Sequence, residues 1–300
     1  MTQTNASLYC TILFDRADMR GRRFKTQNDI DRYVAQGYGQ GSGVDYKPWL
    51  RVQDVPSRGR SRKVKGLKTG RVHHVLSDLE YAYLVVLEFS ERVIDIREQF
   101  PLLPVSPIQD VATQRGIRYP RYAQTTVPFV MTTDFVVTVR TDDGLAREYA
   151  RTVKYADELS SGNRLLRTLE KLELERAWWL QRGVDWQIVT EQSVDPVLAR
   201  NLIWLRGSAQ IERDMQSDEL RARFVEGIGD AGSHDRTLSS LLRTVSYRLR
   251  MPYPDAVKLF KYLIWHKVLL VDLRTPMLLT SQAPKIQVMA SGAAPIKRAA

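Results

Sequence analysis

Hydrophobic residues recur at a helical spacing between positions 76 and 87. The apolar positions of this stretch are Leu76, Leu79, Tyr83, Leu84 and Leu87. A repeat of three to four residues predicts a helix with one buried face. Ser77 and Glu80 fit the S-x-x-E capping box, in which each side chain satisfies a backbone N–H of the first turn, so the helix is expected to begin near Ser77.

Glu80 lies on the apolar stripe of that helix, between Leu84 and Leu87 in projection. A carboxylate on a buried face is costly unless it is paired or binds a metal. Two interpretations of Glu80 therefore stay open. It is either a capping residue, which is the commoner case, or a metal ligand, which needs partners elsewhere in the chain.

A strand pattern follows in the run PFVMTTDFVVTVR, which ends at the turn sequence TDDG. Alternation places Asp134 on one face with Thr132, and places Thr133 and Phe135 on the other face. An aspartate inside such a strand is disfavoured by strand propensity and by burial, unless the strand lies at an edge. Asp134 is therefore the second candidate carboxylate.

The next strand is expected over Ala146–Tyr155, after a three-residue loop in which Gly144 adopts the left-handed conformation. This register places Thr152 opposite Asp134, and Lys154 on the same face as both. A loop one residue shorter or longer would turn Lys154 to the other face, so the alignment depends on the loop length.

A second helix is predicted over LLRTLEKLELERAWWLQR, with Asn163 as its cap and Gly183 as its stop. The run WQIVTE then has a strand pattern, and the order strand, helix, strand indicates a crossover within a mixed sheet. Glu175, on this helix, is expected to face solvent or a salt bridge, with a place near the site as the alternative.

Beyond Pro196 the pattern changes to short helices, which end in a helix and two short strands around residues 274–276. Helices followed by a small hairpin are typical of a winged-helix domain. The predicted divisions are a basic N-terminal region at 1–72, an α/β domain at 73–192, a mostly helical domain at 193–284 and a flexible tail at 285–300.

The charge balance narrows the class of partner. The 300 residues include 45 Lys plus Arg and 34 Asp plus Glu, a formal net charge of +11. Such an excess favours nucleic acid or an acidic membrane surface, with a merely soluble basic protein as the alternative. Seven basic residues and no acidic one lie in a single segment, which is typical of a solvated loop or of an arm that contacts DNA phosphates. These candidate DNA contacts are Arg58, Arg60, Arg62, Lys63, Lys65, Lys68 and Arg71.

Cysteine and histidine usage restricts the metal chemistry. Cys10 is the single cysteine, which excludes an internal disulfide and a cysteine-rich zinc site, and four histidines disfavour a histidine cluster. Any metal is expected to be carboxylate-bound magnesium or manganese. A secretion signal is not apparent, and no apolar run approaches the ~20 residues that cross a bilayer, so a cytoplasmic protein without a membrane partner is expected.

Glu80, Asp134 and Lys154 together have the composition of a metal-dependent phosphodiesterase site. Two carboxylates hold a divalent cation, and a lysine beside them helps to orient a nucleophilic water. In a strongly basic chain this combination predicts DNA cleavage.

Four motifs occur in the order HHVLSDLE, VIDIREQFPLLP, MTTDFVV and VKYADEL. Through these motifs the chain resembles the TnsA family, the endonuclease subunits of the heteromeric transposases of Tn7-like elements, over roughly residues 50–285. The resemblance implies a restriction-endonuclease-like catalytic domain, with a mixed sheet flanked by helices, followed by a mostly helical winged-helix-like domain.

The resemblance also implies roles for individual residues. Glu80 and Asp134 would hold Mg²⁺ or Mn²⁺, the carbonyl of Val153 would add a metal contact, and Lys154 would act on the attacking water.

Three further residues are implied as supporting ones. Gln99 lies in the R-E-Q motif and is expected to shape the site rather than to react, and Glu175 is a further candidate. Thr152 departs from the family pattern, which usually has Glu or Gln two residues before the lysine. A hydroxyl is a poorer ligand, so the number of metal ions stays open.

Members of this family cut the non-transferred strand at the 5′ ends of the transposon. The TnsB transposase cuts and joins the 3′ ends, and the AAA+ ATPase TnsC regulates both. The expected partners are therefore double-stranded DNA at the transposon ends, TnsB and TnsC, with the chain associated with the nucleoid when active.

Two alternatives remain. A stand-alone restriction or junction-resolving nuclease would cut naked DNA without partners. A catalytically degenerate DNA-binding adaptor would not cut at all, and Thr152 is the one feature that favours it. The sequence leaves open whether target choice uses a sequence-specific DNA binder or an RNA-guided complex.

Overall fold

The computed structural model describes residues 24–55, 60–162, 164–232 and 236–289. The chain divides into two compact units, Met1–Ser193 and Val194–Ala300, each of which is described by itself. None of the helices in the described ranges combines the length and the hydrophobicity that a membrane crossing requires.

A four-stranded mixed sheet in the order β3–β4–β5–β6 forms the centre of the N-terminal unit. Strands β3 (Val93–Pro101), β4 (Thr132–Arg140) and β5 (Ala146–Val153) are antiparallel neighbours, and β6 (Asp185–Val189) runs parallel to β5. Helix α5 (Leu165–Leu180) makes the crossover from β5 to β6. The predicted fold class, a mixed α/β domain followed by a mostly helical one, is confirmed.

The β4–β5 hairpin has the predicted register. Phe135 pairs with Arg151, and Gly144 in the loop has a φ of 81°, the left-handed region that favours glycine. Strand β4 is shorter than predicted, because Pro128 instead forms an isolated bridge with Arg121.

Helix α5 begins at Leu165, the first residue of the predicted run. The predicted cap, Asn163, lies outside the described residues, and Arg164 precedes the helix without a side-chain capping bond. The helix stops as predicted just before Gly183, whose φ is 66°. The short 3₁₀ helix η2 (Ala156–Leu159) follows β5.

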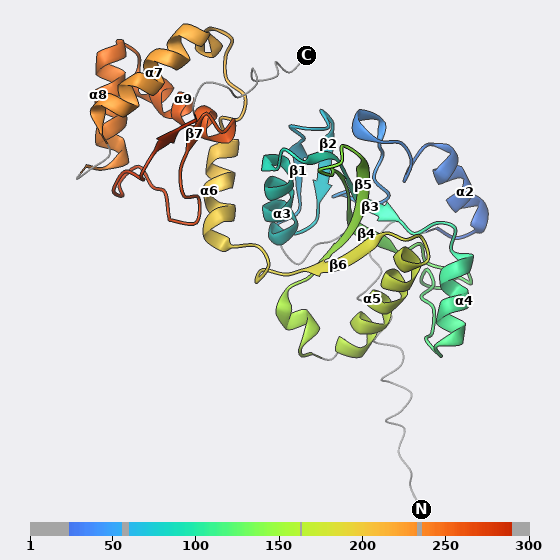
Figure 1. Cartoon of the computed structure of the whole chain (residues 1–300). Helices are drawn as coiled ribbons and strands as arrows, with labels where there is room; N and C mark the ends of the chain where they lie inside the picture. The colour runs from blue at the N-terminus through green and yellow to red at the C-terminus, as the bar shows by residue number, and fades with distance from the viewer. Residues whose placement is uncertain (1–23, 56–59, 163, 233–235, 290–300) are drawn as a thin grey trace, which may run out of the picture. The chain divides into compact units, whose positions relative to one another are not determined.

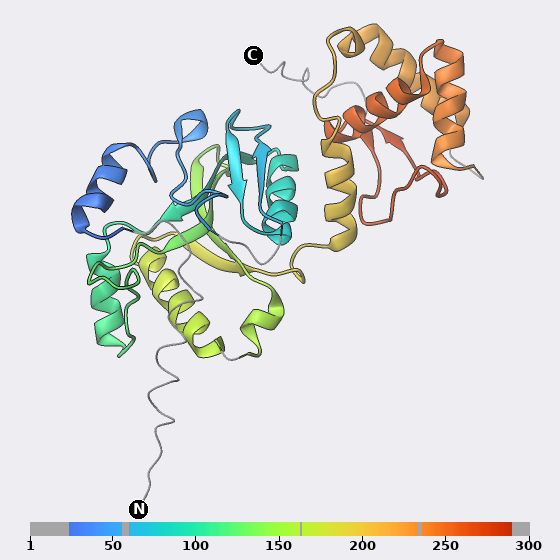
Figure 2. The same cartoon turned by 180° about the vertical axis from the view of Figure 1, so that it is seen from behind.

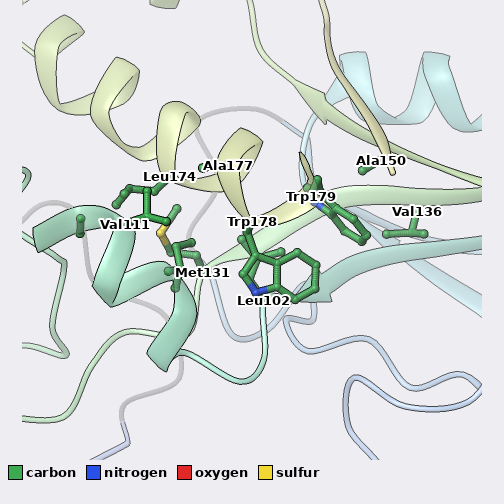
Figure 3. Packing of buried hydrophobic residues seen from close by; sticks show 11 residues of the cluster. Leu102, Val111, Met131, Val136, Ala150, Leu174, Ala177, Trp178 and Trp179 are labelled. Atoms are coloured by element: carbon green, nitrogen blue, oxygen red, sulfur yellow. The ribbon is translucent and has the colours of Figure 1, made fainter. Parts of the chain in front are cut away.

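Two helices cover one face of the sheet (Figure 1). Helix α4 (Ser106–Gln114) packs beside α5, and both contribute to a hydrophobic cluster with the sheet. Trp178 and Trp179 of α5 lie against Val136 of β4 and Ala150 of β5 in this cluster (Figure 3). Val136 and Ala150 therefore mark the sheet face that α5 covers.

Helix α3 (Asp78–Phe89) covers the other face, as the view from behind also shows (Figure 2). The ring of Tyr83 on α3 meets that of Phe135 on β4, with the centroids 5.6 Å apart. A hairpin of β1 (Arg62–Lys65) and β2 (Val72–Val75) contacts α3 and β3. The basic segment that the sequence presented as an arm is thus in part a folded hairpin.

Residues 24–50 contribute to an aromatic cluster of the N-terminal unit, together with residues 122–130. They include helix α2 (Gln27–Ala35), capped by Thr26, and the 3₁₀ helix η1 (Gly43–Asp45). The cluster contains Phe24, Ile30, Tyr33, Trp49, Tyr122, Val127 and Val130. Burial of large aromatic rings makes this cluster a substantial part of the hydrophobic core.

The C-terminal unit is mostly helical. Its helices are α6 (Pro196–Arg206), α7 (Asp218–Ala231), α8 (Leu238–Leu249) and α9 (Tyr253–Trp265), with the 3₁₀ helix η3 (Asp214–Gln216) before α7. Asp195 caps α6 by accepting hydrogen bonds from two of its backbone N–H groups.

The predicted hairpin around residues 274–276 is wrong. Strand β7 (Leu269–Leu270) pairs instead with β8 (Gln287–Val288), which lies in the segment predicted to be a flexible tail. Asn201 of α6 explains the difference, because its side-chain amide bonds the carbonyls of Leu273 and Thr275 at 2.9 and 2.8 Å. Those carbonyls are held by a helix and not by a neighbouring strand. Residues 290–300 lie outside the described part of the chain.

Trp49→Ala tests whether residues 24–50 belong to the core. Trp49 is 1% exposed, and truncation of a buried tryptophan should cost about 3–5 kcal/mol of unfolding free energy. Urea denaturation followed by fluorescence measures the loss. The control Val44→Ala changes a side chain that is 66% exposed and should cost less than about 0.5 kcal/mol. Equal losses in the two variants would contradict this assignment.

Candidate active site

Glu80 lies in the first turn of α3 and is only 6% exposed. Its backbone N–H donates to the Ser77 hydroxyl at 3.0 Å, which confirms Ser77 as the cap. The Glu80 carboxylate accepts from the N–H of Leu76 at 2.8 Å and from the Ser77 hydroxyl at 3.3 Å. The capping box is thus shifted by one residue, because the carboxylate reaches the N–H before the cap.

Gln99 of β3 lies between the two predicted carboxylates. Its side-chain Nε2 is 3.5 Å from Oε2 of Glu80 and 3.4 Å from Oδ1 of Asp134. The Thr132 hydroxyl donates to Oε1 of the same amide at 3.3 Å. One amide therefore brings a carboxylate on a helix and a carboxylate on a strand to a common point.

The second oxygen of Asp134 faces the end of β5. Oδ2 accepts from the backbone N–H of Val153 at 2.7 Å and lies 3.6 Å from Nζ of Lys154. The same ammonium donates to the carbonyl of Val153 at 2.9 Å. The structure thus brings Glu80, Asp134, the Val153 carbonyl and Lys154 together, with Gln99 among them.

The alternation of side chains between the two faces of the sheet is interrupted in strand β3 at Gln99. Residues two apart on a strand normally face the same side of a sheet. The Glu98 side chain, however, binds the β1–β2 hairpin, whereas Phe100 meets Trp179 of α5, with ring centroids 5.6 Å apart. Gln99 has a φ of 49°, which reverses the face between its two neighbours.

The same alternation is interrupted in strand β4 at Asp134, which lies opposite Gln99. Phe135 packs on α3, yet the Thr133 hydroxyl accepts a hydrogen bond from Trp179 Nε1 of α5 at 2.7 Å. The prediction that Thr133 and Phe135 share one face is therefore wrong. Asp134 occupies the inversion point, and the β4–β5 ladder ends at the Phe135 pair.

Glu175 is buried, 4% exposed, so the prediction that it faces solvent or a surface salt bridge is wrong. Its carboxylate accepts from the Thr133 hydroxyl at 2.6 Å and from the Thr152 hydroxyl. Trp186 of β6 donates its Nε1–H to Thr152 at 3.1 Å. Thr152, which stands where the family pattern has Glu or Gln, thus uses its hydroxyl for hydrogen bonds to Glu175 and Trp186. These bonds link α5 to β5 and β6.

Two buried glutamates at the site, Glu80 and Glu175, have raised pKa values. Burial first, and the charge of Asp134 second, raise the pKa of Glu80 to about 8. The same two causes raise the pKa of Glu175 to about 7. Burial lowers the pKa of Lys154, but the nearby carboxylates, Asp134 foremost, raise it more, so its net shift is upward. Glu80 is therefore mostly protonated at neutral pH in the metal-free protein, and a bound cation would favour its ionised form.

Arg71 does not belong to a DNA-binding surface. Its guanidinium is buried and makes two hydrogen bonds to the Glu98 carboxylate, at 2.8 and 2.5 Å. Nδ1 of His73 binds the same carboxylate at 2.7 Å, and the N–H of His74 donates to it at 3.0 Å. Burial alone would raise the pKa of Glu98, but the bonds from His73 and Arg71 lower it to about 2. The prediction of a DNA contact at Arg71 is wrong, because its charge is used inside the unit.

The other predicted DNA contacts lie on or near the β1–β2 hairpin. Arg60 and Lys63 are exposed, and Lys65 on the same strand is exposed as well. Arg62 pairs with Asp78 and lies 4.3 Å from the ring centroid of Tyr81, so it ties the hairpin to the first turn of α3. Lys68 is half-buried, and Arg58 lies outside the described residues.

The donor groups fit a hard divalent cation. Two carboxylates and one backbone carbonyl supply oxygen, which magnesium and manganese prefer. Across the described ranges of the chain, no group of three or more His, Cys, Asp and Glu side chains comes together in a way that would hold a metal. The backbone carbonyl and solvent would therefore have to complete the coordination.

Two protein-family models match adjoining parts of the chain. The model for the TnsA-like endonuclease N terminal matches residues 90–191, and the model for the TnsA endonuclease C terminal matches residues 193–273. The chain belongs to the TnsA family. The first match includes Gln99, Asp134, Lys154 and Glu175, whereas Glu80 precedes it.

A curated relative supports the same family. Over 176 residues the chain is 48% identical to the Transposon Tn7 transposition protein TnsA of Escherichia coli. The alignment covers 59% of this chain and 61% of that relative, so the chain spans less than two thirds of the relative's length.

Glu80 predicts a pH dependence of stability in the metal-free protein. Its folded-state pKa of about 8 exceeds the ordinary value of 4.5, so the folded chain binds more protons than the unfolded chain between these values. Glu80 should therefore lower the free energy of unfolding by about 3–5 kcal/mol as the pH rises from about 5 to about 8. Glu80→Gln should remove this part, and the smaller fall due to Glu175, whose pKa is about 7, should remain. Urea denaturation in EDTA across that pH range measures both.

The control for this prediction is Glu219→Gln. Glu219 is an exposed residue in the first turn of α7, and its replacement should leave the pH dependence unchanged. An equally steep fall in Glu80→Gln and in the wild type would contradict the assignment.

Proposed function

We propose that this TnsA family member is the metal-dependent DNA endonuclease subunit of a heteromeric transposase, and that it hydrolyses the non-transferred strand at the 5′ ends of the transposon. The observation that supports this function best is the convergence of Glu80 and Asp134 on the Gln99 amide, with Lys154 Nζ 3.6 Å from Asp134. Three ionisable groups from different elements have little structural reason to come together in a largely buried space.

Glu80 and Asp134, with the Val153 carbonyl, would hold Mg²⁺ or Mn²⁺. When bound, the cation would supply Lewis-acid activation of a water and neutralise charge on the scissile phosphate. The upward shift of the Glu80 pKa supports this role, because a nearby cation would favour the ionised carboxylate. Both the positions of these oxygen atoms and their electrostatic surroundings therefore support a divalent cation at this site.

Lys154 has a separate task. Its ammonium is held by Asp134 and by the Val153 carbonyl, and its raised pKa keeps it protonated at neutral pH. A fixed positive charge at this place stabilises the negative charge that develops on the phosphate, without adding a competing anion. Water is the nucleophile, so hydrolysis leaves a nick and no covalent protein–DNA intermediate.

Double-stranded DNA at the transposon end is the proposed substrate. Arg62 ties the β1–β2 hairpin, which also carries the exposed Lys63 and Lys65, to the first turn of α3, which carries Glu80. These side chains would contact phosphates near the cleavage position, and phosphate contacts set the position of the duplex without selecting its sequence.

The proposed protein partners are the TnsB transposase, which would act on the 3′ ends, and the TnsC ATPase, which would regulate both. This context follows from the similarity to a transposition protein of Escherichia coli. We place the contacts with TnsC on the C-terminal unit, which carries none of the proposed catalytic groups.

Cleavage of a transposon-end duplex tests the proposed function. With Mg²⁺, TnsB and TnsC present, the wild type should cut the 5′ strand, and Asp134→Ala and Lys154→Met should each lower the rate by about 10²–10³-fold or more. Asp142→Ala, in the loop of the same hairpin, is the matched control and should cut at the wild-type rate. A denaturing gel with a labelled 5′ strand measures the product.

The outcomes separate the alternatives. Cutting without TnsB and TnsC would indicate a stand-alone nuclease. Wild-type inactivity in every mixture, with DNA binding retained, would indicate an adaptor.

The double variant Arg60→Gln/Lys63→Gln tests the DNA-binding hairpin. Loss of two phosphate contacts should weaken binding to duplexes of any sequence and reduce the slope of log K against log salt by about 2. Fluorescence anisotropy at several salt concentrations measures the slope. Arg147→Gln, at the β4–β5 turn, should leave the slope unchanged, and an unaltered slope in the double variant would place the DNA elsewhere.

A further inference from the structure

Gln99 has a backbone conformation that is costly for a residue with a side chain. It has a φ of 49° within β3, and its side chain is 1% exposed. Such a conformation persists only where the surrounding structure imposes it, and it is found most often at functional sites. In this chain it occurs at the residue whose amide lies between the two candidate carboxylates.

Both neighbouring peptide groups are held from outside the sheet. The N–H of Trp49 donates to the Gln99 carbonyl at 3.2 Å, and the Tyr46 hydroxyl donates to the Glu98 carbonyl at 3.0 Å. The Glu98 carboxylate is fixed in turn by Arg71 and by the β2 strand. These contacts hold the chain on each side of Gln99, so that the strand has to turn over at this residue.

The amide of Gln99 has a defined orientation. The Thr132 hydroxyl donates to Oε1, which directs the Nε2 donors toward Glu80 and Asp134. When a cation keeps both carboxylates ionised, they only accept hydrogen bonds, so the opposite orientation of the amide would set an oxygen against them. A neutral donor between two like charges attracts both without competing with a cation for them by charge.

We propose that Gln99 is a positioning residue that holds the Glu80 and Asp134 carboxylates at the spacing that binds a divalent cation. This inference rests on the proposed function, because it concerns the same metal site. The left-handed backbone brings the amide between the carboxylates, and the amide offsets part of their repulsion. Without the amide the two carboxylates separate, and the cation binds more weakly.

Binding of Mn²⁺ to the full chain tests this role without measuring activity. Free Mn²⁺ is quantified by electron paramagnetic resonance for the wild type, Gln99→Leu and Gln99→Gly. Both variants lack the amide, and both should bind Mn²⁺ about 10-fold more weakly, the lower end of the effect of removing a group that orients a metal ligand. Gln99→Gly relieves the backbone and should melt about 2–4 °C above Gln99→Leu.

The glycine variant separates positioning from strain. If Gln99→Gly binds Mn²⁺ as tightly as the wild type, the amide has no role and the inference is overturned. Gln124→Leu is the matched control, because Gln124 is also left-handed, with a φ of 61°, but is exposed. It should bind Mn²⁺ as the wild type does, and weaker binding in this variant would also overturn the inference.

Asp134→Ala distinguishes failure of this inference from failure of the proposed function. If the wild type binds Mn²⁺ and Asp134→Ala does not, the metal site stands, and normal binding by Gln99→Gly then overturns only the role of Gln99. If Asp134→Ala binds as the wild type does, the metal site itself is wrong, and the inference fails with it.

Discussion

Two carboxyl groups that cannot both ionise at neutral pH in a poorly hydrated space are the constraint on which the N-terminal unit depends. Glu80 and Asp134 come from a helix and a strand on different parts of the chain, and each would be better solvated at the surface. The groups that compensate for this loss are one ammonium, one amide, one hydroxyl and two backbone N–H groups. They do not stabilise a second negative charge at neutral pH, which is why the pKa of Glu80 rises to about 8 and why a cation would favour its ionised form.

The Glu98 network shows what a fully compensated buried carboxylate looks like in the same unit. Glu98 is completely buried and meets a guanidinium, an imidazole and a backbone N–H, and its pKa falls to about 2. Glu80 is almost as buried, but its pKa rises. Glu98 and Gln99 are neighbours on one strand but have different surroundings. Glu98 belongs to a buried network in which its charge is compensated, whereas Gln99 belongs to the candidate site, where compensation is incomplete.

Local sequence determined the parts of the site that could be predicted. The loop length and Gly144 fixed the hairpin register, and that register placed Asp134 and Lys154 together. The start of α3 followed from its cap at Ser77. These features depend on residues a few positions apart, and short-range rules describe them well.

The parts of the site that could not be predicted depend on contacts between residues far apart in sequence. Arg71 is basic like its neighbours, and only the fold sets it against Glu98, which is 27 residues away. Glu175 meets Thr133 across 42 residues, so its helix gave no sign of burial. The side chains of β3 change face at Gln99, where the sequence has no glycine that would predict a left-handed conformation. Contacts from other elements impose this conformation.

The paired change of face in β3 and β4 also disfavours slipped pairing of the two strands. In an ordinary antiparallel pair, a shift by two residues restores the alternation of faces and has to be disfavoured by side-chain packing alone. Here each strand changes face at one position, and the ladder matches Glu98 with Phe135 and Phe100 with Thr133. Any slipped alignment would separate the two inversion points and set apolar faces against the wrong helices. The geometry that gathers the carboxylates therefore also selects a single alignment of the central strands.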